Sequence, residues 1–506
     1  MPTLAELMQR CRAVPGSRPW PRASVDAELW QTAGQLLAEG HWTLLSLWAD
    51  SGTVHMALLA EPQAGPGILS LDCANGKFPS IGRLHPPAAR LERTIQDLHG
   101  LEAEGVSDSR PWLDHGSWGV RHPLGEWTPS PTAAMPGYKF LEAEGEGLHQ
   151  IAVGPVHAGI IEPGHFRFTA NGEAVVRLEE RLGYTHKGID GLMREAGLEQ
   201  AVKLAGRTSG DSTVAYALAF SRAVETALQI EVPARAVWLR ALMAEMERLA
   251  NHFGDIGAIC NDASFVVMHA QCGTLRERVL RAADACFGHR LMRDRILPGG
   301  VAADLGEDGI ASLRGLLQEA HRHFPTLVKL YDNTASLQDR TVGTGVLTPA
   351  LARQFGCGGY VGRASGRDFD ARRAFPYAPY DQLQFDVRVA TEGDVNARVW
   401  IRIWEVEQSL ALIEQILDRL PAGPIRIDFD KGSGNPSEGM AIVEGFRGDI
   451  LVWLRLGADG KVARCHMRDP SWFQWPVLEA AIEGNIVADF PLCNKSFNCS
   501  YSGHDL

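Results

Sequence analysis

The sequence predicts an α+β protein with a small N-terminal mixed α/β domain, followed by a large, mainly helical bundle domain with peripheral β-hairpins. Three observations predict this fold class. Short β-rich runs alternate with helical spacing up to residue 118, and residues 119–149 are rich in proline and glycine, as is typical of a linker. From residue 150 onward, long stretches carry apolar residues at intervals of three and four. We therefore expect one domain over 1–118, a linker over 119–149 and a second domain over 150–506.

In the first domain, β-branched and aromatic runs predict strands, and helical spacing predicts two helices. The first two strands are separated by Asp50-Ser51-Gly52, residue types that favour a chain reversal. The expected elements are a helix over 26–39, strands over 42–48, 54–59 and 68–73, and a helix over 87–98.

The second domain is expected to begin with β-structure and to continue as helices. Asn171-Gly172 lies between strand-like runs over 151–161 and 166–178, which is a hairpin signal. The expected helices cover 190–205, 211–230, 234–259, 275–296, 309–331 and 393–420, and their apolar faces predict a bundle. A Gly/Pro-rich loop over 421–439 and a hairpin over 448–467, turning at 458–460, complete the domain.

Composition excludes several classes of function. The net charge of −12 argues against a nucleic-acid-binding protein, which normally has a basic surplus. The nine cysteines are scattered and never spaced as C-x-x-C, which favours reduced thiols over a disulfide framework or a built-in metal site. The N-terminus lacks a signal-peptide pattern, and no window reaches about 18 uninterrupted apolar residues. If the protein works at a membrane, other subunits must hold it there.

Two glycine-flanked loops carry titratable side chains. Residues 154–166 include His157, Glu162 and His165, and residues 182–190 include His186. Rigid loops of this kind can direct titrating groups into a cleft. The alternative is that both are loops leading into helices, with polar residues that cap the backbone.

A polar turn, Arg207-Thr208-Ser209-Gly210-Asp211-Ser212, leads into the expected helix over 211–230. Its two serines lie one helical turn apart, so their hydroxyls can lie side by side. A second serine-rich run, Ser500-Tyr501-Ser502-Gly503, lies at the other end of the chain. We expect the functional question to be whether these two segments meet.

Four blocks, 154–190, 207–225, 237–252 and 468–491, together resemble one protein family. It is the large subunit of membrane-bound (group 4) NiFe hydrogenases of the hydrogenase-4 and formate-hydrogenlyase type, which is related to the large quinone-site subunit of complex I. Residues 91–101 resemble the 30-kDa-type subunit of complex I, fused here to its partner. The resemblance implies a NiFe hydrogenase large subunit-like fold.

The chain departs from this family where the metal would bind. Active members hold nickel and iron with four cysteines, in Arg-x-Cys-Gly-x-Cys and Asp-Pro-Cys-x-x-Cys motifs. The resemblance places Arg207, Ser209, Ser212, Ser500 and Gly503 at these motifs, with Cys499 one position early. A neutral hydroxyl does not replace a bridging thiolate. We therefore predict that the positions of the NiFe site are vacant, and that this chain binds no metal or other cofactor of its own.

The complex I relatives imply quinone as a candidate ligand. There, a histidine in the first hairpin and a tyrosine before the equivalent of the Asp211 helix meet the quinone headgroup. In this chain the place of the histidine falls at Ile161, and no tyrosine stands just before Asp211, so quinone reduction by that pair is not expected. His157, Glu162, His165, His186 and Asp211 are candidates either for a proton path or for structural hydrogen bonds.

Two functions follow from the resemblance. The first is an oxidoreductase subunit that docks an iron-sulfur small subunit, whose cluster accepts or donates electrons. This subunit would couple electron transfer, linked to NADH or quinone, to ion translocation by antiporter-like membrane subunits. The second is a non-catalytic scaffold or conformational coupling subunit of such a complex. Either would sit peripherally on the cytoplasmic face of the inner membrane, without nucleic acid as a partner.

A separate NAD-dependent enzyme is a weaker hypothesis. Residues 356–362 are glycine-rich but lack the strand-turn-helix context of a dinucleotide-binding motif.

Overall fold

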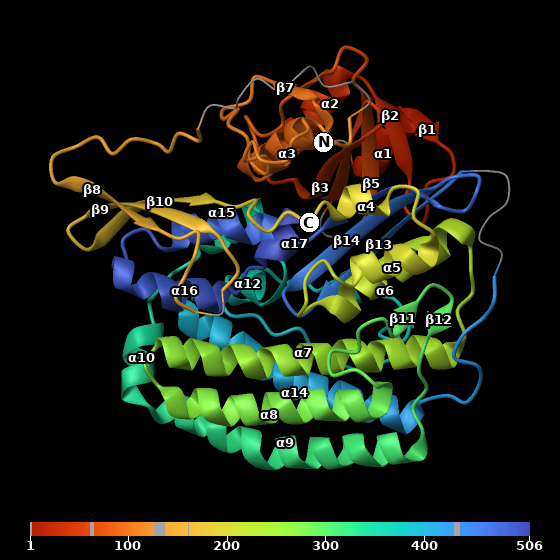
Figure 1. Ribbon diagram of the computed structural model, residues 1–506, viewed down its shortest axis with the longest axis vertical. Coiled ribbons are helices and arrows are strands. Elements are labelled where there is room, and N and C mark those ends of the chain that lie inside the picture. The colour runs from red at the N-terminus through yellow and green to blue at the C-terminus, as the bar shows by residue number, and fades with distance from the viewer. Residues whose placement is uncertain (1–2, 61–64, 126–136, 160, 430–435) are drawn as a thin grey trace.

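The computed structural model describes residues 3–60, 65–125, 137–159, 161–429 and 436–506. It has the predicted α+β architecture, with an N-terminal sheet stacked on a second sheet and a layer of long helices below (Figure 1). Over the described residues, no helix combines the length and apolar character needed to cross a membrane.

The N-terminal part is built on a five-stranded sheet of order β1-β2-β5-β4-β3. Strands β2 and β5 are parallel, and the other neighbours are antiparallel. The predicted elements are confirmed to within a few residues, whereas the short elements before Asp26 and the β6–β7 pair were missed. The bounds are α1 Leu4–Gln9, β1 Arg12–Val14, β2 Arg22–Val25, α2 Ala27–Ala38, β3 Trp42–Asp50, β4 Thr53–Ala60, β5 Gly67–Asp72, β6 Lys77–Pro79, η1 Pro86–Ala88, α3 Ala89–His99 and β7 Glu102–Glu104.

The predicted hairpin at Asn171-Gly172 is confirmed as β9 (His165–Asn171) and β10 (Ala174–Arg181), with β8 (Leu148–Val153) on the outer edge. The predicted strand over 151–161 is wrong beyond Val153, because the chain leaves the sheet at Gly154-Pro155. Proline has no N–H to donate to a strand ladder. The predicted linker loses its last two residues to β8, and its residues 126–136 lie outside the described part.

Long helices form the predicted bundle. Helix α7 (Ala234–Asp262) packs against α8 (Val266–Phe287) and α14 (Val395–Arg419), and α9 (Glu307–Asn333) covers α8. The expected helix over 275–296 is shifted. It ends just before Gly288, whose left-handed φ of 70° terminates a helix at low cost, and Ile296 belongs to a short strand instead.

The expected helix over 190–205 is two helices, α4 (Ile189–Met193) and α5 (Leu198–Ala205). The break falls at Arg194–Gly197, where the backbone of Arg194 is extended and Glu195 adopts a positive φ. Helix α6 (Thr213–Leu228) follows. The remaining elements are β11 Ile296–Leu297, β12 Gly300–Val301, α10 Ala335–Thr341, α11 Pro349–Gln354, α12 Gly359–Ala364, α13 Ala371–Ala374, α15 Ser471–Ala481, η2 Val487–Asp489, α16 Phe490–Phe497 and α17 Tyr501–Asp505.

A three-stranded antiparallel sheet, β13 (Ser437–Gly445), β14 (Gly448–Leu456) and β15 (Val462–Arg468), joins the two parts of the molecule. It contains the predicted hairpin over 448–467, whereas the predicted loop over 421–439 ends early at β13, and its residues 430–435 lie outside the described part. Side chains such as Ala441 and Val443 join the core around α6, whereas Met440 and Ile442 join a core with β3 and β4. Both faces are buried, which explains the apolar runs over residues 440–443 in β13 and 450–454 in β14.

Close backbone contact fixes α6 on this sheet. A Cβ atom at Gly439 would collide with the backbone of Ala223 and with Ala227, both on α6. Only glycine allows this approach, so the last turns of α6 lie against the start of β13. The first turn of α6 lies near the β13–β14 turn, where a Cβ atom at Gly445 would lie 3.4 Å from the Cβ of Ala215.

Candidate functional site

The two serine-rich segments meet. Ser209 Oγ lies 2.9 Å from Ser500 Oγ, and both residues are buried. The predicted candidates Ser209, Asp211, Ser212, Ser500 and Gly503 are therefore brought together, at the point where α6 and α17 begin.

Backbone capping shapes both segments. The Ser209 carbonyl accepts a hydrogen bond from the Ser212 N–H, which closes the turn before α6. On the other side, Asn498 adopts a left-handed conformation that ends α16. Ser500 then caps α17, because its Oγ accepts a hydrogen bond from the Gly503 N–H at 2.9 Å. Each serine thus has a local structural role as well as its contact with the other.

Gly503 is required by close packing. A Cβ atom there would collide with the carboxylate of Asp469 and with Ser500 Oγ. Asp469 is itself fixed, because it accepts hydrogen bonds from the Tyr216 hydroxyl at 2.6 Å and from the Ser471 N–H at 2.8 Å. The site therefore has no room for a side chain at position 503.

Asp211 is held by an arginine that the sequence did not single out. The guanidinium of Arg447, in the β13–β14 turn, donates to Asp211 Oδ1 at 2.7 Å and to Oδ2 at 2.5 Å. Ser209 Oγ donates to Asp211 Oδ1 at 2.9 Å. Burial acts to raise the pKa of Asp211, but Arg447 and the serine hydroxyls hold the pKa below its ordinary value. Asp211 is therefore ionised at neutral pH.

A cleft of about 280 Å³ opens beside this pair. Glu162 reaches it from the β8–β9 loop, where its Oε2 accepts a hydrogen bond from the Ser502 N–H at 3.1 Å. Burial raises the pKa of Asp262, although Lys495 opposes this shift. The lining also includes Ile161, Ser209, Gly210, Asp211, Arg447, Pro491, Asn494, Asn498, Cys499, Ser500, Tyr501 and Ser502. The cleft is therefore polar, with charges of both signs.

The residues at this site do not fit a NiFe centre. Its donors are hydroxyls and a carboxylate that already forms a bidentate ion pair, whereas nickel in such a centre needs soft thiolates. Cys499 supplies a single sulfur, and burial raises the pKa of that thiol well above its ordinary value. Among the described residues, no group of three or more His, Cys, Asp or Glu side chains is arranged to hold a metal ion.

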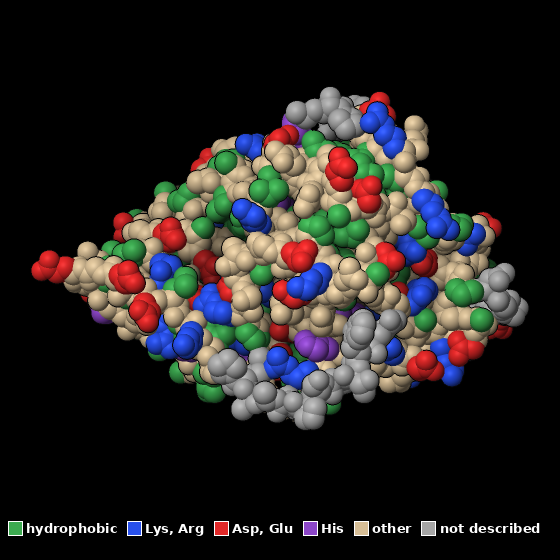
Figure 2. Space-filling view, turned by 90° about the horizontal axis from the view of Figure 1, so that it is seen from above, with side chains coloured by type: hydrophobic (Ala, Val, Ile, Leu, Met, Phe, Trp, Pro, Cys, Tyr) green, Lys and Arg blue, Asp and Glu red, His purple; other side chains and the backbone are tan. Residues whose placement is uncertain are grey.

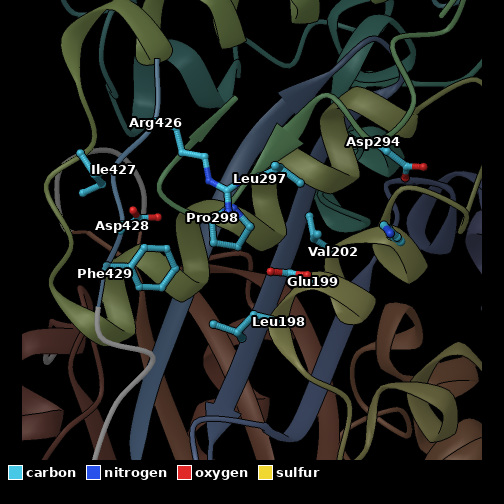
Figure 3. A pocket seen from close by; sticks show the side chains of 11 residues that line it. Leu198, Glu199, Val202, Asp294, Leu297, Pro298, Arg426, Ile427, Asp428 and Phe429 are labelled. Atoms are coloured by element: carbon cyan, nitrogen blue, oxygen red, sulfur yellow. The ribbon is translucent and has the colours of Figure 1, made fainter. Parts of the chain in front are cut away.

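Arg207 lies outside the cleft. Its guanidinium donates to Asp294 Oδ1 at 2.7 Å and Oδ2 at 2.8 Å, on a partly exposed surface. Asp294 lines a separate pocket of about 370 Å³ between α5, the β11–β12 turn and residues 426–429, in which Phe429 and Pro298 form an apolar side (Figure 3). The structure therefore separates Arg207 from the serines that follow it.

The candidate histidines also lie apart from the cleft lining. His157 Nε2 is 2.8 Å from the Gly164 carbonyl, and His165 Nδ1 is 3.1 Å from the Gly154 carbonyl, so both brace the β8–β9 loop. His186 Nδ1 is 2.7 Å from the Asp505 carbonyl and stacks on Trp118. These contacts match the structural alternative for each histidine.

The residues that sequence reasoning missed are Arg447, Asn498, Lys495, Asp262 and Tyr501, all in the cleft lining. Of these residues, Arg447 could have been found from the sequence, because it is a lone cation between Gly445-Phe446 and Gly448 in an apolar hairpin. The others come from helix ends that only the tertiary structure brings together.

The exposed charges do not form a stripe of one sign on the face seen in Figure 2. Acidic and basic side chains are interspersed there, over the N-terminal part of the molecule. This distribution is unlike the clustered basic surface of a nucleic-acid-binding protein.

Comparisons with known proteins give consistent results. Residues 262–440 match the family described as respiratory-chain NADH dehydrogenase, 49 Kd subunit. The chain is 32% identical over 447 residues to formate hydrogenlyase subunit 5 of Escherichia coli (strain K12), covering 86% of this chain and 78% of that protein. It is 30% identical over 446 residues to the C/D subunit of the NADH-quinone oxidoreductase of Bacteroides thetaiotaomicron, covering 82% of each.

Among solved structures, one chain of the membrane-bound sulfane sulfur reductase, described as an archaeal respiratory membrane complex, has a similar fold. The TM-score is 0.67 at 27% identity, and the match covers 71% of this chain and 99% of that chain.

Proposed function

The chain belongs to the family that joins the complex I 49-kDa subunit with the NiFe hydrogenase large subunits, and from this premise we propose that it is a subunit of a respiratory membrane complex of that type. Its relatives include subunits of formate hydrogenlyase and of NADH-quinone oxidoreductase. We propose that it docks an iron-sulfur subunit and couples electron transfer to ion translocation by membrane subunits, from the cytoplasmic face of the membrane.

The observation that carries this proposal is the hydrogen-bonded contact between the Ser209 and Ser500 hydroxyls, which bears on whether the subunit holds nickel. In the proposed alignment with the family motifs, Ser209, Ser212, Ser500 and Gly503 occupy the positions of the four metal-binding cysteines. Hydroxyls hydrogen-bonded to one another and to Asp211 do not supply the thiolates of a NiFe centre. We therefore propose a redox-complex subunit that works without nickel.

The cleft supports a role in binding a small polar ligand or in proton exchange. Because Arg447 keeps Asp211 ionised, Asp211 is suited to holding charge in place rather than to releasing a proton. Asp262 is better suited to take up a proton, since burial raises its pKa. Quinone remains a candidate ligand, with Tyr501 as the tyrosine at the cleft and Ile161 at the proposed place of the quinone histidine.

A non-catalytic scaffold is the alternative. The observation that favours it is that Ser209, Asp211 and Ser500 satisfy one another, so the site is stable without a ligand. In that case the site would hold the N-terminal part, the bundle and the membrane partners in a fixed arrangement, or pass a conformational change between them, without electron transfer.

The deciding experiment is isolation of the whole complex from membranes through a tag on this chain. Elemental analysis is expected to find iron from the partner subunit but no stoichiometric nickel. Electron transfer to quinone, ferredoxin or NAD would be measured with the wild type and with Asp262→Asn. Loss of turnover in the variant, with the same subunits present, supports the redox role. A complex without any such activity, which still assembles, supports the scaffold, and one nickel per chain would overturn the proposal.

As a matched control, Asp308→Asn changes an aspartate in the exposed first turn of α9, outside the cleft lining. This variant is expected to match the wild type in both its complement of subunits and its turnover.

A further inference from the structure

A network of buried ionisable side chains lies behind the cleft, between α7, α12, α13, α14 and β13. It contains three arginines and four carboxylates, all buried: Arg248, Arg363, Arg372, Glu245, Asp370, Glu405 and Glu444. None of these residues takes part in the cleft lining described above.

The arginines connect the carboxylates in a chain. Arg372 binds Glu245 at 3.0 Å and Asp370 at 2.7 Å. Arg363 binds Glu405 at 2.6 Å and Glu444 at 2.9 Å, and its Nη1 lies 3.5 Å from Asp370 Oδ2.

Arg248 completes the network from α7. It lies 3.0 Å from Glu405 and 3.5 Å from Glu245, and it donates to the Glu444 carbonyl at 2.9 Å. The network is therefore continuous through contacts within 3.5 Å.

The charges of this network do not balance. Four ionised carboxylates against three guanidinium groups leave one excess negative charge in a region shielded from water, which is costly. A single bound proton removes the excess. The candidates to hold this proton are one of the four carboxylates and the imidazole of His252, whose Nε2 lies 2.8 Å from Glu405 Oε2. Burial lowers the pKa of His252, which disfavours the imidazole.

The contacts favour Glu444 as the proton carrier. Glu405 faces two guanidinium groups and His252, Asp370 receives several bonds from Arg372, and Glu245 is held by Arg372, Tyr380 and Ser409. Glu444 has one guanidinium contact, from Arg363, and one N–H, from Ala371. Protonated His252 would leave its Nδ1–H without a partner, because Nδ1 has no hydrogen-bond partner in the described structure.

The surroundings of Glu444 agree with this assignment. Asp370 lies in the same network, Asp449 lies opposite on β14 and is bound by Arg468, and the Tyr377 hydroxyl lies near the Glu444 N–H. On the far side of Tyr377, Arg222 stacks on the ring, with Glu225 and Arg240 as its charged neighbours. Burial, together with repulsion from Asp370, raises the pKa of Glu444 to about 7.

We propose that this buried network is a proton-binding site, in which Glu444 holds one exchangeable proton. The site is joined to the cleft by a short turn, because Phe446 lies two residues after Glu444, and Arg447, the partner of Asp211, follows directly. His252 contacts the Phe446 ring edge-on, and the Arg447 guanidinium lies over that ring. A charged ligand in the cleft, beside Arg447, is thus placed to shift proton occupancy at Glu444, and the reverse. The inference goes beyond the proposed function and does not depend on it.

The test is infrared difference spectroscopy on the purified full-length chain, titrated from about pH 5 to about pH 9. A protonated buried carboxyl group gives a C=O stretching band that shifts on deuteration. The wild type is expected to show a band that disappears as pH rises through about 7. Glu444→Gln is expected to weaken this band, to which the buried Glu92 also contributes, whereas the matched control Glu438→Gln, on the same strand, is expected to leave it unchanged.

Spectra of Glu444→Gln that superimpose on the wild type would overturn the proposal. If Glu444→Gln does not fold, Glu444→Asp retains a carboxyl group in a changed position, so its band must shift in frequency or midpoint, and an unchanged band would overturn the proposal equally. Neither readout needs partner subunits or turnover, so failure here is distinguishable from failure of the proposed redox role.

Discussion

Ser209 and Ser500 lie 291 residues apart in the chain and 2.9 Å apart in space, hydroxyl to hydroxyl. This contact forms part of the wall of a polar cleft, at the place where α6, α17 and the β13–β14 turn meet. Removing the Ser209 hydroxyl by Ser209→Ala is expected to cost about 2–3 kcal/mol of unfolding free energy, because a hydrogen bond to a carboxylate and one to Ser500 are lost. Chemical denaturation of the purified chain measures this cost. A variant as stable as the wild type would show that the contact contributes nothing.

Arg447 is expected to matter far more to stability than Arg207. Arg447→Gln leaves the Asp211 carboxylate without its bidentate partner, and we expect a loss of about 2–3 kcal/mol, discounted because the Asp211 side chain is about one-third exposed. Arg207→Gln removes a similar bidentate pair from a more exposed place and is expected to cost less than about 1 kcal/mol. Denaturant midpoints of the two variants test the comparison. Equal losses would contradict the placement of Arg207 outside the cleft.

Gly503 is expected to reject any side chain. Gly503→Ala forces a Cβ atom against Asp469 and Ser500 and should destabilise the fold by about 1–3 kcal/mol. For the same reason, introducing cysteines at 209, 212, 500 and 503 together is expected not to restore a nickel site. Thermal unfolding measures the first effect and elemental analysis the second.

The matched control for Gly503→Ala is Gly197→Ala. At Gly197 a Cβ atom would meet open space, and the backbone is extended with a φ of −66°, which any residue adopts. This variant is expected to unfold at nearly the wild-type temperature. Equal destabilisation of both variants would show that the collision with Asp469 is not the cause.

Glu444 is expected to make stability depend on pH. Its pKa is about 7 in the folded chain and lies in the ordinary glutamate range when unfolded, so the folded state binds the proton more tightly. The resulting stabilisation is complete below the unfolded pKa and is lost as pH rises from about 4.5 to about 7, by about 3 kcal/mol. Glu444→Gln should make the slope shallower, whereas Glu92 and Glu247, whose pKa values burial raises to about 7 and about 8, keep their own contributions. Unfolding free energies of both proteins across this range provide the measurement, and parallel curves would contradict the assignment.

Trp112 is expected to hold the segment that carries Ser500. Its indole Nε1 donates to His504 Nε2 at 3.2 Å, and His504 also stacks on Trp472. Trp112→Phe keeps most of the ring contact and loses the hydrogen bond, at a cost of about 1 kcal/mol. Hydrogen exchange of residues 500–506 should then accelerate more than exchange of α7. Uniform acceleration would instead indicate general loosening of the core.

Much of the fold follows from local patterns. The apolar runs of β3 and β4 and the three-to-four spacing of α7, α9 and α14 can be read directly from the residues, because the two strands are buried on both faces and the helices pack through apolar stripes. The shift of α8 could not be read as easily. Its first turns carry the exposed Val266 and Val267, so apolar spacing is a poor guide to where it begins, and its end is set by Gly288 rather than by the next apolar residue.

The candidate site was also predictable from the sequence only in part. The serine-rich turns at 207–212 and 500–503 were visible as polar breaks before helices, and the predicted departure from a thiolate motif rests on the resemblance to the family. The sequence could not reveal that Arg447 binds Asp211, nor that His157 and His165 bond to their own loop, because side-chain direction depends on how distant elements pack.

The sequence by itself determined the fold class, the main helices and strands, and the identity of the serine-rich turns, since these depend on local periodicity and residue chemistry. Only the tertiary structure decided that Ser209 meets Ser500, that Arg447 fixes Asp211, and that four carboxylates share three arginines around Glu444. The physical reason is that hydrogen bonds and ion pairs depend on distances of about 3 Å between residues hundreds of positions apart, which packing sets and local pattern does not encode.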